Sequence, residues 1–376
     1  MKYIFFSIII LVTALPAIYS ASRFCSNLSF ITWIKWVVIP VYIILFLSLL
    51  ASLIAGQAAG ARLESILLSA GFSFLVATIY FSFFFIAYDL IVLIIKVSGL
   101  YKLIPDSGLR VAGELFTVAV LITTAALMVW GHHRFNNPVV TAMEIDLGRG
   151  RPSEELNVVI ASDLHLGNNI GRADLERFVQ LINRSEADIV LLAGDITDNR
   201  LKPLISQNMN KLLSAITAKF GVYAVPGNHE FYGGEKQEII EFLRSAGITV
   251  LADSTVLTAG GKVIIAGRDD RTNKDRMPLD ILLSKVDRNK PVILMDHQPV
   301  NLNEVESAGI DISVSGHTHN GQFWPGNLIV KWMYDHGYGY MKKSRTHFIV
   351  SSGLGLWGPK YRIGTVSEIV SVKLKL

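Results

Sequence analysis

The chain of 376 residues is 51% hydrophobic and only 18% charged, and its mean hydropathy is +0.41. These values exclude an ordinary water-soluble protein, and the length predicts two or three domains. The net charge of +4 includes no dense run of lysine or arginine, so nucleic acid is not favoured as a partner. Cys25 is the only cysteine, which excludes internal disulfides and thiolate metal sites.

Nearly all of the hydrophobic excess lies before residue 134. Residues 3–22 are uncharged and long enough to cross a bilayer, although the small residues at 20–22 also permit a cleaved signal peptide. We predict an all-α transmembrane region of about four helices in residues 1–134, with three or five as alternatives. The three further apolar stretches are residues 36–61, 65–88 and 115–131.

The charges that flank these stretches predict no orientation. Five lysines or arginines fall on each side of the predicted membrane, so the positive-inside rule favours neither topology. Asp89 follows the third stretch directly. We interpret it as a helix-end residue that reaches the interface, and a functional role inside the membrane is the alternative.

Residues 135–376 have the alternating pattern of an α/β domain with an added antiparallel β portion. Leu175, Phe178, Val179 and Ile182 share one helical face, and Gly260-Gly261 predicts a hairpin. In chain order the predicted elements are a strand at 139–147, a polar turn at 148–155, helices at 172–183, 204–220, 235–246 and 278–286, hairpin strands at 255–258 and 262–266, and strands at 346–351 and 367–374.

Polar side chains follow five apolar runs at the point where each run ends. In α/β folds ligands bind at such strand ends. One such ending is more often a turn or a helix cap, but five together indicate a metal centre. The runs at 156–161, 189–193, 222–225, 292–294 and 312–314 lead respectively to Asp163 and His165, Asp195 and Asp198, Asn228 and His229, His297, and His317 and His319.

The residue types fit divalent metals that accept imidazole nitrogen and carboxylate oxygen together. Asp163 and His165 are two residues apart, so both side chains can face the same way on an extended strand end. Gly194 allows a sharp turn that presents the carboxylate of Asp195 to two ions, as two-metal hydrolysis requires. Asn228 adds a neutral oxygen to a site that already carries carboxylates.

These blocks, in this order, resemble the signature of the calcineurin-like metallophosphoesterases, and the resemblance covers roughly residues 139–376. It implies a four-layer α/β/β/α sandwich in residues 135–376. The tail at 352–364 is similar to that of a membrane-associated bacterial branch that includes the YkuE and YaeI phosphodiesterases. The matching blocks are Asp163-Leu164-His165, Gly194-Asp195-Ile196-Thr197-Asp198, Gly227-Asn228-His229-Glu230, His297 and Gly316-His317-Thr318-His319.

The resemblance also implies a role for each site residue. His229 would protonate the leaving group or stabilise the transition state, and Asp198 would orient and charge its imidazole. Two divalent ions are implied, with Mn, Fe and Zn as candidates. Asp163, His165, Asp195 and His319 would hold the first ion, and Asp195, Asn228, His297 and His317 the second.

The other polar and aromatic residues receive structural interpretations. Asp296 precedes His297 where the family commonly has a small residue, and we expect it to face solvent. Trp324, Trp332, Tyr334, Tyr338 and Trp357 are expected mostly to pack the β portion, with a lipid-facing groove as the alternative. Arg268, Asp270 and Arg271 are expected in a charged turn rather than on a substrate phosphate, His132 and His133 at the membrane interface, and His336 and His347 in structural positions.

The sequence therefore predicts a multi-pass protein of a bacterial cell membrane that hydrolyses phosphodiester or pyrophosphate bonds by metal-activated water. A lipid or a lipid-linked nucleotide is the expected substrate. One alternative is a phosphomonoesterase or nucleotide phosphodiesterase that is merely anchored to the bilayer. The other is a membrane sensor or transporter with a metal-binding module. The sequence predicts no oligomeric state.

Overall fold

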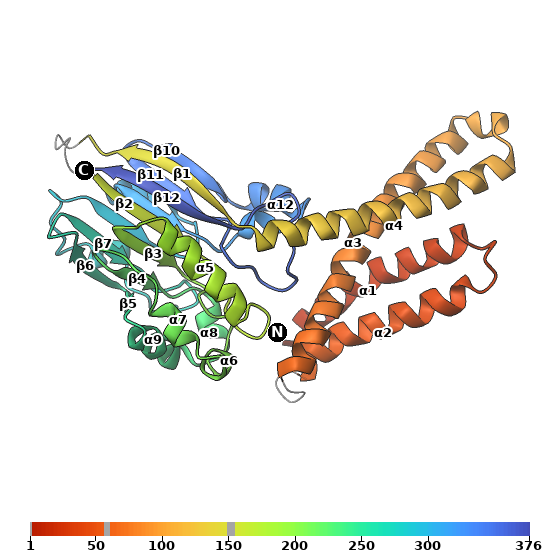
Figure 1. Cartoon of the computed structure of the whole chain (residues 1–376). Helices are drawn as coiled ribbons and strands as arrows, with labels where there is room; N and C mark the ends of the chain where they lie inside the picture. Colours follow the sequence, from red (N-terminus) through yellow and green to blue (C-terminus); the bar gives the residue numbers. More distant parts are fainter. Residues whose placement is uncertain (1, 56–60, 149–154) are drawn as a thin grey trace. The chain divides into compact units, whose positions relative to one another are not determined.

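The computed structural model describes residues 2–55, 61–148 and 155–376 (Figure 1). The chain divides into two compact units, residues 1–130 and residues 131–376. Most of the predicted turn at 148–155 and the end of the predicted stretch at 36–61 fall outside the described residues.

The first unit is helical, as its composition predicts. It consists of α1 (Lys2–Asn27), α2 (Ile34–Ala55), α3 (Ala61–Val97), a short 3₁₀ helix (Leu100–Leu103) and α4 (Asp106–Asn136), which continues into the second unit. Among the described residues, α2, α3 and α4 are long and apolar enough to cross a membrane. A fourth span in α1 stays a prediction.

Aromatic side chains and one ion pair hold α1 against α3. The ring of Phe24 lies edge-on to Phe81 and Phe85, with centroids 5.0 and 5.2 Å apart. Asp89 accepts a hydrogen bond from Tyr19 Oη at 2.5 Å and pairs with Arg23. Asp89 lies eight residues before the end of α3 and is neutralised by α1, because a carboxylate in an apolar helix needs a partner.

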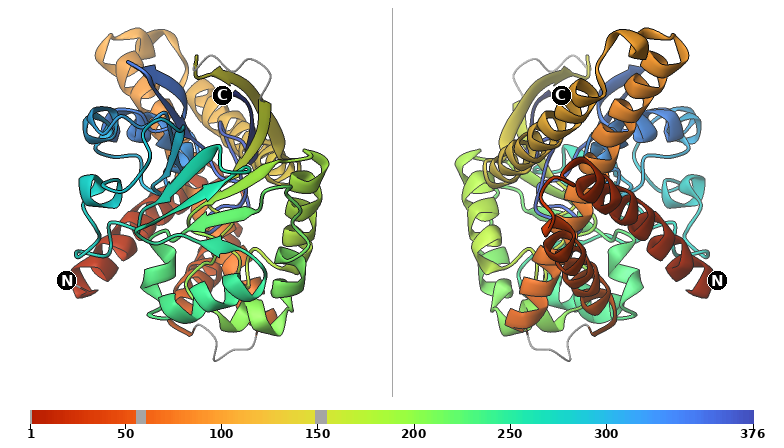
Figure 2. Two further views of the ribbon diagram at one scale, coloured as in Figure 1. Left: turned by 90° about the vertical axis from the view of Figure 1, so that its left-hand side faces the viewer. Right: turned by 90° about the vertical axis from the view of Figure 1, so that its right-hand side faces the viewer.

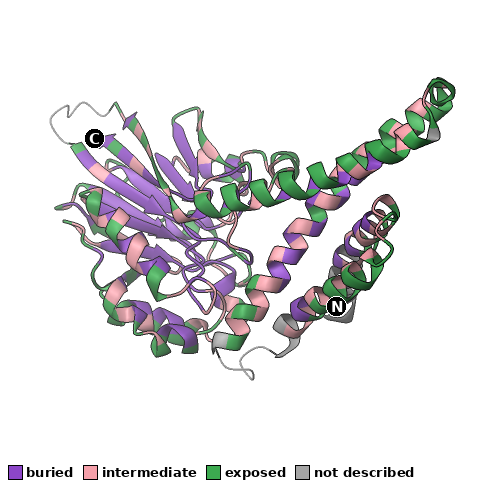
Figure 3. Cartoon of the chain, turned by 45° about the vertical axis from the view of Figure 1, so that its right-hand side comes forward, coloured by how far each residue is buried: buried purple, intermediate pink, exposed green. Residues whose placement is uncertain are grey.

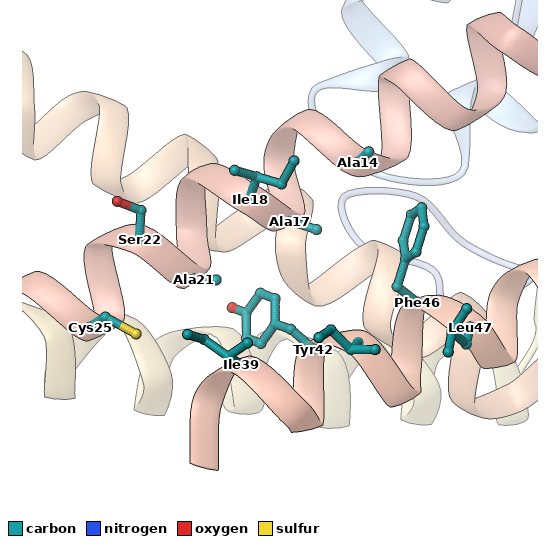
Figure 4. Close-up of a pocket in the computed structure, with 11 residues that line it drawn as sticks. Ala14, Ala17, Ile18, Ala21, Ser22, Cys25, Ile39, Tyr42, Phe46 and Leu47 are labelled. Atoms are coloured by element: carbon teal, nitrogen blue, oxygen red, sulfur yellow. The ribbon is translucent and has the colours of Figure 1, made fainter. Parts of the chain in front are cut away.

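An apolar cavity of about 570 Å³ lies between α1 and α2 (Figure 4). Ala14, Ala17 and Ala21 recur at helical spacing on α1, and their small side chains leave open space opposite Tyr42 and Phe46 of α2. Ser22, Cys25 and the hydroxyl group of Tyr42 are the polar groups in its lining. Such a lining suits hydrocarbon rather than a charged ligand.

The second unit contains two six-stranded sheets. In the first sheet, β12 pairs parallel with β1 and antiparallel with β2, and the remaining neighbours are parallel. Its order is β1 (Val139–Asp146), β12 (Glu368–Lys375), β2 (Glu155–Ala161), β3 (Ile189–Ala193), β4 (Val222–Val225) and β5 (Thr249–Val250).

The second sheet has parallel inner strands and antiparallel pairs at both edges. The predicted hairpin forms one of these edges. The order is β10 (Gly339–Lys343), β11 (Thr346–Val350), β9 (Ile312–Ser315), β8 (Val292–Met295), β7 (Val263–Gly267) and β6 (Ser254–Thr258).

Helices cover the outer face of each sheet (Figures 1 and 2). The helix predicted at 204–220 is wrong in length, because Asn208 has a left-handed backbone (φ 52°) that ends α6 and the chain turns again after Leu213. On the first sheet lie α5 (Arg172–Arg184), α6 (Lys202–Ser206), α7 (Met209–Leu213) and α9 (Lys236–Ser245), and on the second α10 (Leu279–Leu282) and α11 (Leu302–Ser307).

The predicted four-layer order follows from the two-residue period of the strands. Val159 and Ala161 of β2 pack under α5, whereas Val158 and Ile160 point into the core between the sheets. A separate cluster buries α10 and α11 against β7 and β8. The inner strands therefore lie buried on both faces, as their purple colour in Figure 3 shows, and the α/β/β/α sandwich is confirmed.

The end of α4 belongs to this sandwich. Phe135 is fully buried in the core beneath the first helix layer, and Arg177 of α5 donates a hydrogen bond to the carbonyl of Asn136 at 2.9 Å. β1 begins only three residues later, at Val139. The final turn of α4 is thus a structural part of the domain rather than a linker.

Phe135→Ala is expected to destabilise the domain by about 3–5 kcal/mol, because it leaves a cavity in a close-packed core. Thermal unfolding of the detergent-solubilised full chain measures this as a midpoint lower by roughly 10 °C. Leu257→Ala, at an exposed position on β6, is the control and should leave the midpoint nearly unchanged. Equal midpoints for both variants would show that Phe135 does not support the core.

Candidate metal centre

The predicted site residues lie at the carboxyl ends of five parallel strands. β2, β3 and β4 of the first sheet lead directly into Asp163, Asp195 and Asn228, and β8 and β9 of the second sheet lead into His297 and His317. The site is therefore assembled from both sheets. The structure brings together Asp163, His165, Asp195, Asp198, His229, His297, His317 and His319. Asn228 directly precedes His229 in the chain.

The first group consists of Asp163, His165 and His319, whose candidate ligand atoms lie within 4.8 Å of one another. The Nε2 atoms of His165 and His319 are 3.2 Å apart, and Asp163 Oδ1 is 3.5 Å from His319 Nε2. Burial lowers the pKa of both imidazoles well below the usual value, which favours the neutral form with a free lone pair. Two lone pairs and a carboxylate that converge in this way suit a divalent cation.

The second group consists of Asp195, His297 and His317. His297 Nδ1 is 2.8 Å from the carbonyl of Ala193 and donates to it, which leaves Nε2 as the nitrogen that faces Asp195 Oδ2 at 3.1 Å. Asn228 Oδ1 is buried and has no hydrogen-bond partner among the described residues. A buried orphan oxygen is costly unless something binds it, and a cation would satisfy it.

Asp195 is shared by the two groups. Its Oδ2 atom is 3.7 Å from His165 Nε2 of the first group and 3.1 Å from His297 Nε2 of the second. Its Oδ1 atom accepts a hydrogen bond from the backbone N–H of His229 at 2.8 Å. The carboxylate is thus fixed with one oxygen directed between both sets of nitrogens.

The backbone at the site is held in a conformation that non-glycine residues rarely adopt. Each such residue costs about 1–3 kcal/mol and persists only where the surroundings enforce it. One enforcing contact is the approach of Gly316 to Ser162, where a Cβ atom would lie 1.7 Å from the hydroxyl oxygen. The left-handed residues are Asp163 (φ 55°), His165 (φ 47°), Asp195 (φ 50°), His317 (φ 73°) and His319 (φ 51°).

His229 and Asp198 form a pair beside the two groups. Asp198 Oδ1 is 3.2 Å from His229 Nδ1. Burial alone would lower the pKa of His229, but the proximity of Asp198 and of Asp195 raises it above the ordinary value. The rings of Tyr232 and Trp357 lie 5.1 and 6.5 Å from the imidazole, so aromatic side chains border it.

Glu230 is a site residue to which the sequence reasoning gave no role. Its buried carboxylate accepts hydrogen bonds from the backbone N–H groups of Gly227 (2.7 Å), Thr197 (2.9 Å) and Asp195 (3.2 Å). It therefore locks the loops after β3 and β4 together. Its position in the Gly-Asn-His-Glu block was the available signal.

Two interpretations of charged residues are wrong. Asp296 does not face solvent but is 4% exposed, and its carboxylate lies 3.2 Å from Arg276 and 3.5 Å from Arg268. Asp270 is fully buried and accepts hydrogen bonds from Gln298, so this segment is not an ordinary charged turn, although Arg271 is exposed. A buried charge is tolerated here because opposite charges and donors surround it.

The expected packing of the aromatic residues is also wrong for most of them. Trp332 is 85% exposed and Trp357 is 50% exposed, and Trp324 and Tyr338 are exposed as well. Tyr334 is half-buried, with its ring 6.4 Å from that of His317. Among the remaining histidines, His347 contacts Tyr340, His336 contacts the carbonyl of Gly339, and His132 contacts the carbonyl of Lys360.

Comparison with known proteins finds relatives that share this domain. An uncharacterized metallophosphoesterase of Helicobacter pylori is 35% identical over 227 residues, which are 59% of this chain and 60% of that protein. A transmembrane protein with metallophosphoesterase domain from Danio rerio is 32% identical over 275 residues, 69% of this chain and 62% of its own. The uncharacterized metallophosphoesterase YkuE of Bacillus subtilis is 30% identical over 235 residues, 58% of this chain and 78% of its own.

This chain spans about 60% of the length of the Helicobacter pylori relative. The similarity to YkuE confirms the predicted branch of the family. The calcineurin-like phosphoesterase family profile matches residues 156–321. That interval runs from β2 to the last histidine of the first group, and so includes every residue of both groups. The chain therefore belongs to the calcineurin-like phosphoesterase family.

Proposed function

We propose that this protein hydrolyses phosphoesters with two divalent cations, and that it does so at a membrane. Residues 135–376 would carry the reaction, and residues 1–134 would hold that domain in the bilayer. The observation that carries the proposal is the position of Asp195 Oδ2, which faces His165 Nε2 and His297 Nε2 at 3.7 and 3.1 Å. A carboxylate shared between two sets of ligands is what a dinuclear site requires.

The first cation would be bound by the first group together with Asp195, and the second by the second group together with Asn228. Two such cations supply positive charge that acidifies water and stabilises charge developing on phosphoryl oxygens. Mn, Fe and Zn all accept this mixture of imidazole and oxygen ligands. The proposed ligands are Asp163, His165, Asp195 and His319 for the first cation, and Asp195, Asn228, His297 and His317 for the second.

His229 would supply the proton that the leaving oxygen needs. Because its Nδ1 faces Asp198 at 3.2 Å, Nε2 is the nitrogen left to donate toward substrate. The raised pKa of His229 favours the charged imidazolium, which suits a general acid. Asp198 would hold the ring in this orientation and stabilise its charge.

The substrate would be a phosphodiester or a pyrophosphate of a lipid or a lipid-linked nucleotide. The apolar helices α2, α3 and α4 support this choice, because a domain joined directly to a membrane span meets membrane-embedded substrates at high local concentration. A phosphomonoesterase anchored to the bilayer and a metal-binding sensor or transporter are the competing functions.

Removal of the shared carboxylate is the first test. Asp195→Asn is expected to lose bound metal and to lower hydrolysis of bis-p-nitrophenyl phosphate at least about 100-fold, because a neutral amide cannot balance two cations. Elemental analysis and initial rates measure the two effects. Asp275→Asn, on an exposed loop, is the matched control. Full function of Asp195→Asn in cells would instead support the sensor or transporter.

Removal of the proposed acid should separate chemistry from metal binding. His229→Ala is expected to keep its metal content and to lower kcat by roughly 10²–10⁴-fold, the usual contribution of a general acid. His336→Ala removes a histidine outside the site and should change neither quantity. Unchanged turnover in His229→Ala would rule out the catalytic role of His229, and lost metal would indicate that it is a ligand.

The bond that is cleaved can be identified with two chromogenic esters. The full-length protein should hydrolyse bis-p-nitrophenyl phosphate, lose this activity when a chelator removes the metal, and regain it with Mn²⁺, Fe²⁺ or Zn²⁺. Little hydrolysis of p-nitrophenyl phosphate is expected. The opposite preference would support the phosphomonoesterase, and activity that survives complete removal of the metal would contradict a metal-dependent reaction.

A further inference from the structure

Helix α12 (Gly326–Met333) presents apolar side chains to the surface of the domain. Leu328, Ile329, Trp332 and Met333 are 55%, 56%, 85% and 62% exposed. Their spacing places them on one side of the helix, which we call the α12 face. An exposed cluster of this kind marks a surface that contacts something apolar, because single exposed residues are normal but contiguous ones are not.

Both ends of α12 are fixed beside the metal centre. The helix follows a 3₁₀ turn (His319–Gly321) that carries a histidine of the first group. Gly321 lies so close to Gly326 that a Cβ atom on Gly321 would be 2.1 Å from the carbonyl carbon of Gly326. At the other end, Tyr334 lies 6.4 Å from His317, ring to ring. Thr318 Oγ1 also donates a hydrogen bond to the carbonyl of Gly337 at 2.6 Å. The α12 face therefore lies at the rim of the site.

The same rim is joined to the end of α4 within the second unit. The backbone N–H of Arg362 donates to the carbonyl of Gly131 at 2.9 Å, and His132 Nδ1 is 3.1 Å from the carbonyl of Lys360. The next residue, Ile363, accepts a hydrogen bond from the backbone N–H of Trp324 at 2.7 Å. One short segment thus connects the last turns of a candidate membrane span with the residues that lead into α12.

The chemistry of the α12 face fits the headgroup region of a bilayer. Residues 316–334 contain no acidic residue, and Lys331 lies on the helix beside Trp332. Tryptophan next to lysine on an apolar helix is typical of elements that lie in a membrane interface, where the ring meets acyl chains and the cation meets anionic headgroups.

We propose that the α12 face inserts into the headgroup region of the bilayer that the apolar helices cross. The docked surface is a lipid surface, and not a second copy of this chain. Since the α12 face borders the metal centre, the centre would then meet phosphoesters at the membrane surface. That last consequence rests on the proposed function, whereas the docking itself does not.

Site-directed spin labelling tests the docking without any measurement of hydrolysis. Full-length protein carrying Cys25→Ser receives one new cysteine, Leu328→Cys or Leu257→Cys, and a nitroxide label. Leu328 and Leu257 are 55% and 52% exposed. Leu257 lies on β6, at one edge of the second sheet, whereas β10, the strand that follows α12 in the chain, forms the opposite edge. Each protein is placed in nanodiscs of phosphatidylcholine and phosphatidylglycerol, and collision rates with oxygen and with a water-soluble nickel chelate are measured.

The ratio of oxygen to nickel collisions should be several-fold higher at position 328 than at position 257, because oxygen concentrates in lipid and the chelate in water. Met333→Cys labels the same face if Leu328→Cys does not fold. Equal ratios at the α12 face and at position 257 would overturn the proposal. Dipolar broadening that appears only with two protein molecules per disc would overturn it as well, by showing that a second copy covers the face.

Discussion

The structure depends on the burial of one carboxylate. Asp195 is almost completely enclosed, and burial alone would raise its pKa, yet the neighbouring imidazoles, His297 above all, lower it overall and favour the charged carboxylate. A buried anion destabilises a fold unless positive charge and hydrogen-bond donors surround it. The neighbouring carboxylate of Glu230 does not balance the charge of Asp195, but it accepts backbone hydrogen bonds that fix the loop that carries Asp195. The site is therefore a place where the fold accumulates negative charge that cations can balance.

The backbone contributes to this arrangement as much as the side chains do. Five of the seven proposed ligands have left-handed φ angles, and that conformation turns the chain sharply just after each strand. Glycine would adopt it without strain but would offer no ligand atom. The strain is sustained by the core between the sheets, where residues such as Val158 and Ile293 pack both strand layers together. The backbone conformation that presents the ligands therefore lowers stability locally, and the packing of the sandwich offsets this cost.

The parts of the fold that were predictable from sequence are those with a strong local signal. β2, β3 and β4 are apolar runs that end in polar residues, and the order of those endings predicts where the candidate site residues gather. The two sheets were implied only by the family resemblance, and the pattern of residues did not show which strands pair, because pairing is a long-range property. It also did not show that Asn208, which has a left-handed backbone, separates two short helices.

The remaining errors share one cause. Trp332 was expected to pack the β portion and Asp296 to face solvent, because hydropathy ordinarily decides burial. Asp296 is buried because Arg268 and Arg276 accompany it, and these partners are 28 and 20 residues away in the chain. The apolar residues of α12 are exposed although nothing in their local sequence distinguishes them from a core helix. At Asp296 and on α12, burial therefore differs from what hydropathy predicts for an average soluble domain.

The position of β12 has a consequence for synthesis of the protein. This strand lies between β1 and β2, so the first sheet is interrupted until residues 368–375 have left the ribosome. The apolar helices emerge long before that point and can enter a bilayer while the sandwich is still incomplete. The segments that are long and apolar enough to cross a membrane are therefore made before the strand that completes the first sheet.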